Sequence, residues 1–504
     1  MTKKIILFIV FLLLCSVVIF IIRQVTHKES FAETDDAVFW EEIEYKEKIA
    51  SNTPLKFIIQ ENSTACVIYD SSYVRFSSIT IPATAHIGGH DYRVTRIGDC
   101  SFQNCTGLTN IEIPFGVTEI GSMAFSKCEN LKSITIPTST EIIGLCAFEE
   151  CRSLTNILIP ASVRHIGNNP FCKCSKLRSI NVYHRNRNYS SENGILYDKD
   201  KKTIIAVPNA LKGKVTIPSS VTTIEEDAFF GCSINEVSIP NSVTEIKSSA
   251  FRECVNLKNI TLPPGLMCIE SYAFCNCDSL SSINIPKNIT EIRQYTFSHC
   301  ISLTDVTIPQ GVTYIEDHAF EECTALKDIT IPSGVTVIKE SVFDECENLK
   351  NISVVSDNPN YSSVNGILCN KEMTEIITVP QGIKGNINIP FGITRIKTKA
   401  FIRCDKLTSI NIPSSVTDIE KDAFRDCRSL SKVTLSEGLA RIEECAFGRC
   451  INLKNIKIPV TVVSIGDGAF WGCEKLNVVI DNGRYGLNIG EHALDDCKSV
   501  NYIQ

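Results

Sequence analysis

A repeat of 23 residues constrains the fold of this chain more than any other feature of its sequence. Each unit begins at a proline, continues with Val, Thr and Ile, then an Ala-Phe pair, a Cys, a Leu and two Ile before the next proline. The aromatic position recurs at Phe102, Phe125, Phe148, Phe171, Phe229, Phe251, Phe274, Phe297, Phe320, Phe343, Phe401, Phe424, Phe447 and Phe470, and Leu494 ends the series. A fixed period of this length indicates a solenoid, in which each coil buries its apolar side chains only by stacking on its neighbours.

The order of residues within one unit predicts the path of a coil. Ile134 and Ile136 are two residues apart and so face the same side of a short strand, which Pro137 ends because it cannot donate a ladder hydrogen bond. Ala124 and Phe125 fall on a tight turn that closes the coil. We therefore predict an α/β-type leucine-rich repeat solenoid of about 17 coils, mostly short parallel β-strands with turns and short 3-10 segments. The side chains predicted to stack as core ladders include Phe125, Phe148, Phe274, Phe297, Phe320, Cys128, Cys151, Cys277, Cys300 and Cys323.

Two stretches break the repeat, and they match each other. In each stretch, two successive phenylalanines of the repeat position lie 58 residues apart, from Phe171 to Phe229 and from Phe343 to Phe401. The two breaks are 172 residues apart. Both contain Asn-Tyr-Ser-Ser, then Asn-Gly-Ile-Leu, and later Lys-Gly. We predict duplicated hairpin inserts at about 181–217 and 353–389, with a strand of the first at Gly194–Tyr197 and a turn at Lys199–Lys201.

The N-terminus contains a targeting segment. Eighteen residues from Ile5 to Ile22, all apolar except Ser16, follow two lysines, and this run is nearly enough to span a bilayer core and longer than a usual signal-peptide core. This pattern favours an uncleaved, single-pass signal anchor with the bulk of the chain outside the cell, and a secreted form cleaved near Ala32 is the alternative. The predicted segments are a cytoplasmic tip (1–4), a transmembrane anchor helix (5–22), an acidic linker (23–54), an N-terminal cap coil (55–99) and the solenoid (100–504).

Cysteine is unusually frequent, and most of it occupies one position of the repeat. Fifteen of the 24 cysteines lie three residues after the repeat aromatic. Free Cys behaves as a small buried apolar side chain, and stacked Cys have parallel rather than converging Cα–Cβ vectors, which disfavours disulfides. We predict a ladder of buried free thiols, with pairing of Cys146 or Cys445 to a local ladder cysteine left open.

The sequence contains no constellation of residues that supports catalysis. The eight His lack metal-ligand spacing in a suitable helix, and the two glycines between His86 and His90 predict a hairpin turn. No nucleophile elbow, phosphate-binding loop or zinc-protease motif occurs. A net charge of −7 gives no basic face for nucleic acid. We therefore predict a protein that is not an enzyme and binds no cofactor, metal, nucleic acid or small-molecule substrate.

The remaining functional candidate is a polar surface along the coils. The strand residue between the two inward Ile faces outward, and in most coils it is Thr, Asn or Ser. The residues predicted to form this binding face are Glu112, Thr135, Asn181, Thr261, Asn284, Thr307, Thr330, Ser353, Asn411 and Thr434. A weakly charged face rich in donors and acceptors suits a protein or glycan ligand, and the alternative is that Thr and Asn merely suit solvent-exposed strands.

The repeat unit at 331–352 and the two inserts resemble the BspA-like family of leucine-rich repeat surface proteins, over about 400 residues from 100 to 497. Residues 55–97 resemble the N-terminal coil of that family. The resemblance implies a cell-surface or secreted protein used in adhesion and in host or matrix binding. We therefore expect a non-catalytic surface protein that mediates protein–protein or cell–matrix adhesion, with a self-associating structural rod or a secreted effector as alternatives.

Overall fold

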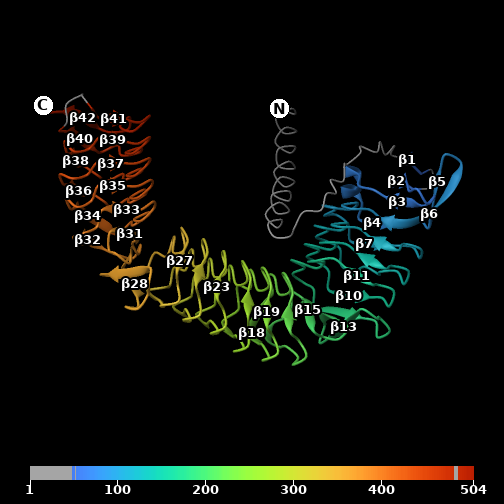
Figure 1. Cartoon of the computed structure of the whole chain (residues 1–504). Helices are drawn as coiled ribbons and strands as arrows, with labels where there is room; N and C mark the ends of the chain where they lie inside the picture. The colour runs from blue at the N-terminus through green and yellow to red at the C-terminus, as the bar shows by residue number, and fades with distance from the viewer. Residues whose placement is uncertain (1–47, 51–52, 482–485, 504) are drawn as a thin grey trace. The chain divides into compact units, whose positions relative to one another are not determined.

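The computed structural model of the protein describes residues 48–50, 53–481 and 486–503, all within one compact unit (Figure 1). This unit is a β-solenoid of about 18 turns. Within the described residues there is no α-helix, and the single 3-10 helix, η1 (Ser71–Arg75), precedes the regular repeats. The predicted α/β class is therefore wrong, because the described repeats contain no α-helix and none of the short 3-10 segments that were expected within the coils.

The predicted transmembrane helix (5–22) lies outside the described residues. No helix in the part of the chain that the structure describes is long and apolar enough to cross a membrane. The fold class is accordingly corrected to an all-β solenoid for the described part of the chain.

One side of the solenoid, which we name the strand face, consists of the longer parallel strands, one from each coil. Most end close to the proline of their repeat, as at Ile159, which precedes Pro160. Strands of this face are β4 (Ser78–Thr80), β7 (Asn110–Glu112), β10 (Asn156–Ile159), β12 (Ser179–Val182), β16 (Gly213–Thr216), β18 (Ile234–Ser238), β20 (Asn259–Thr261), β22 (Ser282–Asn284), β24 (Asp305–Thr307), β26 (Asp328–Ile331), β28 (Asn351–Val354), β32 (Gly385–Asn388), β34 (Leu407–Ile412), β36 (Lys432–Leu435), β38 (Asn455–Ile458), β40 (Asn477–Ile480) and β42 (Ser499–Tyr502).

A second side, the short-strand face, carries mostly two-residue strands formed after each proline turn. In the C-terminal coils of Figure 1, the two faces run as parallel columns, with even-numbered strands in one and odd-numbered strands in the other. Strands of this face are β6 (His90–Ile97), β8 (Glu119–Ile120), β9 (Ile142–Ile143), β11 (His165–Ile166), β15 (Thr203–Ala206), β17 (Thr223–Ile224), β19 (Glu245–Ile246), β21 (Cys268–Ile269), β23 (Glu291–Ile292), β25 (Tyr314–Ile315), β27 (Val337–Ile338), β31 (Glu375–Thr378), β33 (Arg395–Ile396), β35 (Asp418–Ile419), β37 (Arg441–Ile442), β39 (Ser464–Ile465) and β41 (Asn488–Ile489).

The third side, the turn face, contains the Ala-Phe segment of each repeat and explains why no helix forms. In the coil of Phe125, the N–H groups of Met123, Phe125 and Lys127 donate to carbonyl oxygens of the next coil at 2.7, 2.8 and 2.7 Å. The residues between them donate to carbonyl oxygens three residues earlier. This alternation places Met123 and Lys127 in the left-handed region, with φ of 53° and 62°. Hydrogen bonds between coils offset that backbone cost, which is roughly 1–2 kcal/mol per residue.

Antiparallel strands cover the N-terminal end of the solenoid. β1 (Lys48–Ile49), β2 (Lys56–Ile59) and β3 (Ala65–Val67) pair in order, and β3 then joins β6 in parallel. β1 lies within the segment assigned to the acidic linker, so the cap begins earlier than expected. β5 (Thr84–Ile87) and β6 form a hairpin whose turn, Gly88–Gly89, has φ of 58° and 80°. The hairpin predicted between His86 and His90 is confirmed.

Each insert adds two antiparallel strands to the short-strand face. In the first, β13 (Tyr189–Glu192) pairs with β14 (Ile195–Asp198), and β14 pairs with β15. In the second, β29 (Tyr361–Val364) and β30 (Ile367–Asn370) repeat this arrangement with β31. The Asn-Gly pair of each motif forms the tight turn, with positive φ at both residues, as type I′ turns require.

The sheet of the strand face is not continuous along the solenoid. It runs unbroken from β32 to β42, but within the described residues β20 is not paired with β22, nor β24 with β26. The strand predicted around Ile134 and Ile136 is also absent from 131–137, where the hydrogen bonds from Lys132 N and Thr155 N to the preceding coil lengthen to 3.4 Å. The short-strand and turn faces therefore hold these coils together more tightly than the strand face does.

Candidate functional site

The structure places the residues of the predicted binding face along one side of the solenoid. All ten are the outward residues of the strand face, and nine are exposed, whereas Ser353 is half-buried. Neighbouring coils align them directly, as shown by the pairing of Asn284 with Thr307 and of Asn411 with Thr434. The face is thus a regular column of side chains at the spacing of parallel strands, about 4.8 Å.

A second outward column lies beside the first, two residues earlier in each strand. On β22 it adds Ser282 to Asn284, and on β24 it adds Asp305 to Thr307. Some of these side chains bond to their neighbours, such as Ser409 Oγ, which donates to Asn386 Oδ1 at 3.1 Å. The two columns together form a surface of hydroxyl and amide groups with few charges.

The core beneath this face is a set of stacked side chains. The ten residues expected to form the core ladders have an exposed fraction of 0%. Rings of neighbouring coils are nearly parallel, with centroids 5.7 Å apart for Phe274 and Phe297 and 5.4 Å apart for Phe297 and Phe320. The positions of the strand-face residues are therefore held by a close-packed interior.

The ladder cysteines hydrogen-bond to the backbone of the preceding coil. Cys300 Sγ donates to the carbonyl oxygen of Phe274 at 3.2 Å, and Cys323 Sγ donates to that of Phe297 at 3.2 Å. Burial raises the pKa of the Cys254 thiol to about 12, and burial also raises that of Cys277 well above its ordinary value. All cysteines in the described part of the chain are free. These thiols are protonated structural groups rather than nucleophiles.

Sequence reasoning missed one pair of residues that organises the inserts. Asn186, which is 1% exposed, donates from Nδ2 to the carbonyl oxygens of Pro160 and Val163 at 2.8 and 2.9 Å. Its Oδ1 accepts from the N–H of Asn188 and of Tyr189, both at 2.8 Å. Asn358 makes the same four bonds in the second insert. The signal was available, because Asn186 and Asn358 are 172 residues apart like the rest of the duplicated motif.

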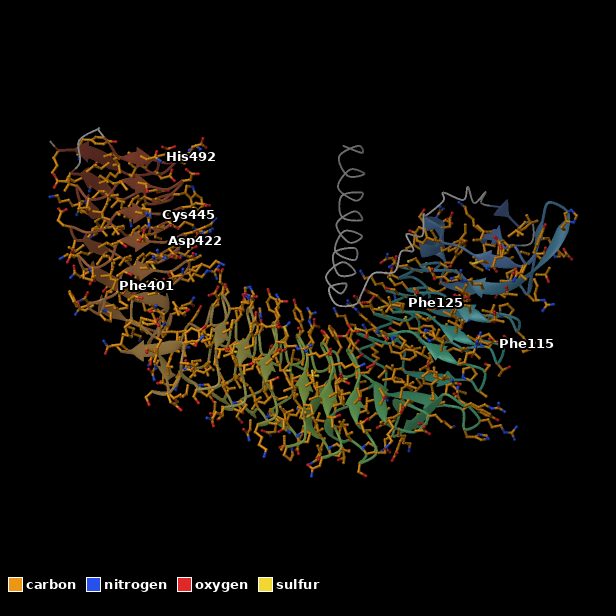
Figure 2. All side chains as sticks on the ribbon, in the orientation of Figure 1. Phe115, Phe125, Phe401, Asp422, Cys445 and His492 are labelled. Atoms are coloured by element: carbon orange, nitrogen blue, oxygen red, sulfur yellow. The ribbon has the colours of Figure 1, made fainter. Side chains whose placement is uncertain are left out.

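The left-handed positions of the turn face were also missed. They recur at equivalent places of successive coils, and Figure 2 shows Asp422, Cys445 and His492, which share one such position, above one another. Several carry large side chains that stack along the solenoid axis, as do Tyr295 and His318, with ring centroids 4.7 Å apart. Single-sequence patterns give no signal for these positions, since glycine rarely occupies them.

A groove of about 310 Å³ opens on the strand face at the break between β20 and β22. Its floor is aliphatic and its rim is polar. It is lined by Ile260, Thr261, Leu262, Ser282, Ile283, Asn284, Asp305 and Thr307. Three of the predicted binding residues, Thr261, Asn284 and Thr307, therefore converge on one depression.

A second depression, of about 270 Å³, lies beside the second insert and is charged. Arg403 pairs with Glu345 across it, and Lys406 Nζ donates to the carbonyl oxygen of Glu347 at 2.6 Å. Asp405 Oδ1 accepts from the N–H of Arg428 at 3.0 Å. Because these groups satisfy one another, the depression favours no particular ligand.

The surface histidines pair with carboxylates rather than with each other. His299 Nε2 lies 3.0 Å from Glu322, and His318 Nδ1 lies 3.1 Å from Glu321. Within the ranges that the structure describes, no group of three or more His, Cys, Asp or Glu side chains is placed to hold a metal ion.

Comparisons with known proteins agree with this geometry. A family model described as BspA type leucine rich repeat region matches in six copies, over residues 72–204, 209–297, 268–385 and 383–501. The chain is similar to a leucine rich cell surface protein from Faecalibacterium prausnitzii (26% identity, 95% of this chain, 96% of that chain, TM-score 0.45). It is also similar to leucine-rich repeat proteins from Eubacterium ventriosum (23%, 64% and 94%, 0.52) and Bacteroides ovatus (26%, 92% and 100%, 0.44). No curated protein matches the chain.

Proposed function

Because the chain belongs to the BspA-type leucine-rich repeat family, which confirms the resemblance read from the repeat, we propose that it is a non-catalytic cell-surface protein that mediates adhesion through its strand face. Proteins with such repeats are protein-binding scaffolds. The similar protein from Faecalibacterium prausnitzii is described as a cell surface protein.

The observation that carries this proposal is the alignment of exposed, weakly charged side chains over many coils. Within each strand, exposed outward residues alternate with residues that face the core. Thr330, Asn411 and Thr434 are such exposed outward residues. A surface of this kind loses little backbone entropy when a partner binds, since the core already fixes its backbone. It suits a broad ligand better than a small one.

A binding experiment with charge substitutions tests the proposal. Beads coated with the full chain are applied to a panel of purified extracellular matrix proteins and to intact cells. We expect Thr330→Glu and Thr434→Glu, made together, to abolish adhesion, since each places a buried charge in any interface formed on the strand face.

Matched controls lie on the other side of the same coils. Thr336 and Thr417 are exposed, and each donates its hydroxyl to the threonine carbonyl oxygen of the preceding coil at 3.2 Å. Thr336→Glu and Thr417→Glu should leave adhesion unchanged. Absence of adhesion by the unsubstituted chain, or an equal loss in both pairs of variants, would contradict the proposal. Sedimentation of the pure chain as an oligomer would instead support a self-associating rod.

A further inference from the structure

We propose that the groove between β20 and β24 binds a neutral, hydroxyl-rich saccharide chain. The inference deepens the proposed function by naming a ligand class for part of the strand face, and it rests on that function only in using the same surface. It is carried by a break in the sheet, by unengaged polar side chains and by the chemistry of the lining.

The break in the sheet exposes backbone groups that other coils keep paired. β22 pairs with β24 and β20 pairs with β18, but no ladder joins β20 to β22 within the described residues. The facing edges of these two strands therefore present N–H and C=O groups to the groove. Unpaired backbone groups are strong hydrogen-bonding partners for an incoming ligand.

A second copy of the same local sequence shows that the break, and not the residue types, makes this place different. Ser282-Ile283-Asn284-Ile285 is repeated as Ser409-Ile410-Asn411-Ile412. The second copy lies on β34, which pairs with β32 and with β36. The aliphatic side chains of the preceding strand are equally buried at both places, since Ile260 and Leu262 are 8% and 7% exposed and their counterparts Ile387 and Ile389 are also 8% and 7% exposed. The two copies therefore differ in backbone pairing and not in the burial of the aliphatic residues.

The polar side chains at the groove are free to bind. Five polar side chains of the groove make no side-chain hydrogen bond or ion pair to any described residue: Thr261, Ser282, Asn284, Asp305 and Thr307. In the matched copy, by contrast, Ser409 donates a hydrogen bond to Asn386. Hydroxyl and amide groups both donate and accept, and an ionised carboxylate accepts two bonds. Asp305 can therefore accept from two adjacent hydroxyls of one sugar ring, and the other four groups can satisfy its remaining hydroxyls.

The lining selects against other ligand classes. The lining includes the Asp305 carboxylate and no Lys, Arg or His, so an anionic ligand would place like charges together without a compensating cation. Because successive coils repeat the same outward columns, an extended chain can continue along the solenoid beyond the groove.

Isothermal titration of the full chain with neutral hexasaccharides (cello-, xylo-, manno-, malto- and N-acetylchito-hexaose) tests the inference. At least one should bind. We test one double variant, Ser282→Ala with Asn284→Ala, and one single variant, Asp305→Asn. Each should weaken saccharide binding by about tenfold or more, because hydrogen bonds to the saccharide are lost. The control variant, Thr336→Ala with Thr417→Ala on the other side of the coils, should bind as the unsubstituted chain does. Circular dichroism confirms that each variant is folded.

The outcomes separate this inference from the proposed function. Adhesion to matrix proteins without binding of any hexasaccharide overturns the saccharide site and leaves the adhesion proposal standing. An equal loss of saccharide binding in the Ser282/Asn284 and Thr336/Thr417 variants also overturns it, because the loss would then not depend on the groove. Hexasaccharide binding at the groove without adhesion to cells or matrix supports the site and contradicts the adhesion proposal.

Discussion

Raising the pH should unfold this protein through its ladder of buried thiols. Five ladder cysteines of successive coils are each 0% exposed, and burial raises the pKa of every one of these thiols above the ordinary 9.0. They are Cys254, Cys277, Cys300, Cys323 and Cys346. Because the folded pKa exceeds the unfolded one, the stabilisation is fully present below about pH 9 and is lost as the pH rises towards the folded value, about 12 for Cys254.

The size of the effect follows from proton linkage. At pH 10 the unfolded thiol is largely ionised while the buried thiol keeps its proton, which costs about 1.4 kcal/mol per cysteine. Five such thiols at about 1.4 kcal/mol each give about 7 kcal/mol, comparable to the whole free energy of unfolding of many domains. Tyr73 and Tyr197, whose pKa burial raises to about 12, add to the loss at higher pH.

Urea unfolding followed by circular dichroism at pH 7 and pH 10, with a phosphine reductant present, measures this loss. We expect a much lower unfolding midpoint at pH 10. Cys300→Ala should destabilise the protein at pH 7 but should reduce the difference between the two pH values by about 1.4 kcal/mol, since it removes one linked proton. Equal midpoints at pH 7 and pH 10 would refute the reasoning.

Three further predictions address the core, the inserts and the location of the protein. In denaturant titrations, Phe297→Ala should lower the free energy of unfolding by about 3–5 kcal/mol, because it removes a fully buried ring and leaves a cavity. The control Phe391→Ala, at a side chain that is 91% exposed, should change the free energy of unfolding by less than about 0.5 kcal/mol. Asn186→Ala should cost roughly 1–3 kcal/mol or more through the carbonyl and N–H groups left without partners, and exposed Asn188→Ala should cost far less. Brief trypsin treatment of intact cells should release peptides from 100–497, and release only after lysis would contradict a surface location.

The hydrophobic period was enough to predict which side chains stack. Phe297 and Cys300 recur at one position of a fixed repeat, and any coil that closes on itself must bury that position. The same reasoning identified Thr307 and Asn411 as outward residues, since they alternate with buried Ile on short strands. Whether these outward residues bind a ligand stays a prediction.

The α/β class was wrong because the short 3-10 segments that it includes do not form in the described repeats. The tight turn at Ala124 and Phe125 was predicted, but the backbone conformation within it was not. Met123 and Lys127 adopt left-handed backbone whose hydrogen-bond partners, Leu145 and Glu149, belong to the next coil. Local propensity disfavours that conformation for residues other than glycine, so it forms only when a neighbouring coil is stacked against it. The groove at β20 and β22 was missed for a related reason, since identical Ser-Ile-Asn-Ile sequences are paired at one place and unpaired at another.

The sequence by itself determined the period, the inward ladders, the outward columns and the duplicated inserts, because each of these depends on residues close together in one coil. Only the tertiary structure decided where the sheet of the strand face is continuous and where it opens, and how the turn face satisfies its backbone. Those features depend on the distance between coils, to which every neighbouring coil contributes. Hydrogen bonds between strands weaken steeply with that distance, so a small change in stacking separates a closed sheet from an open groove.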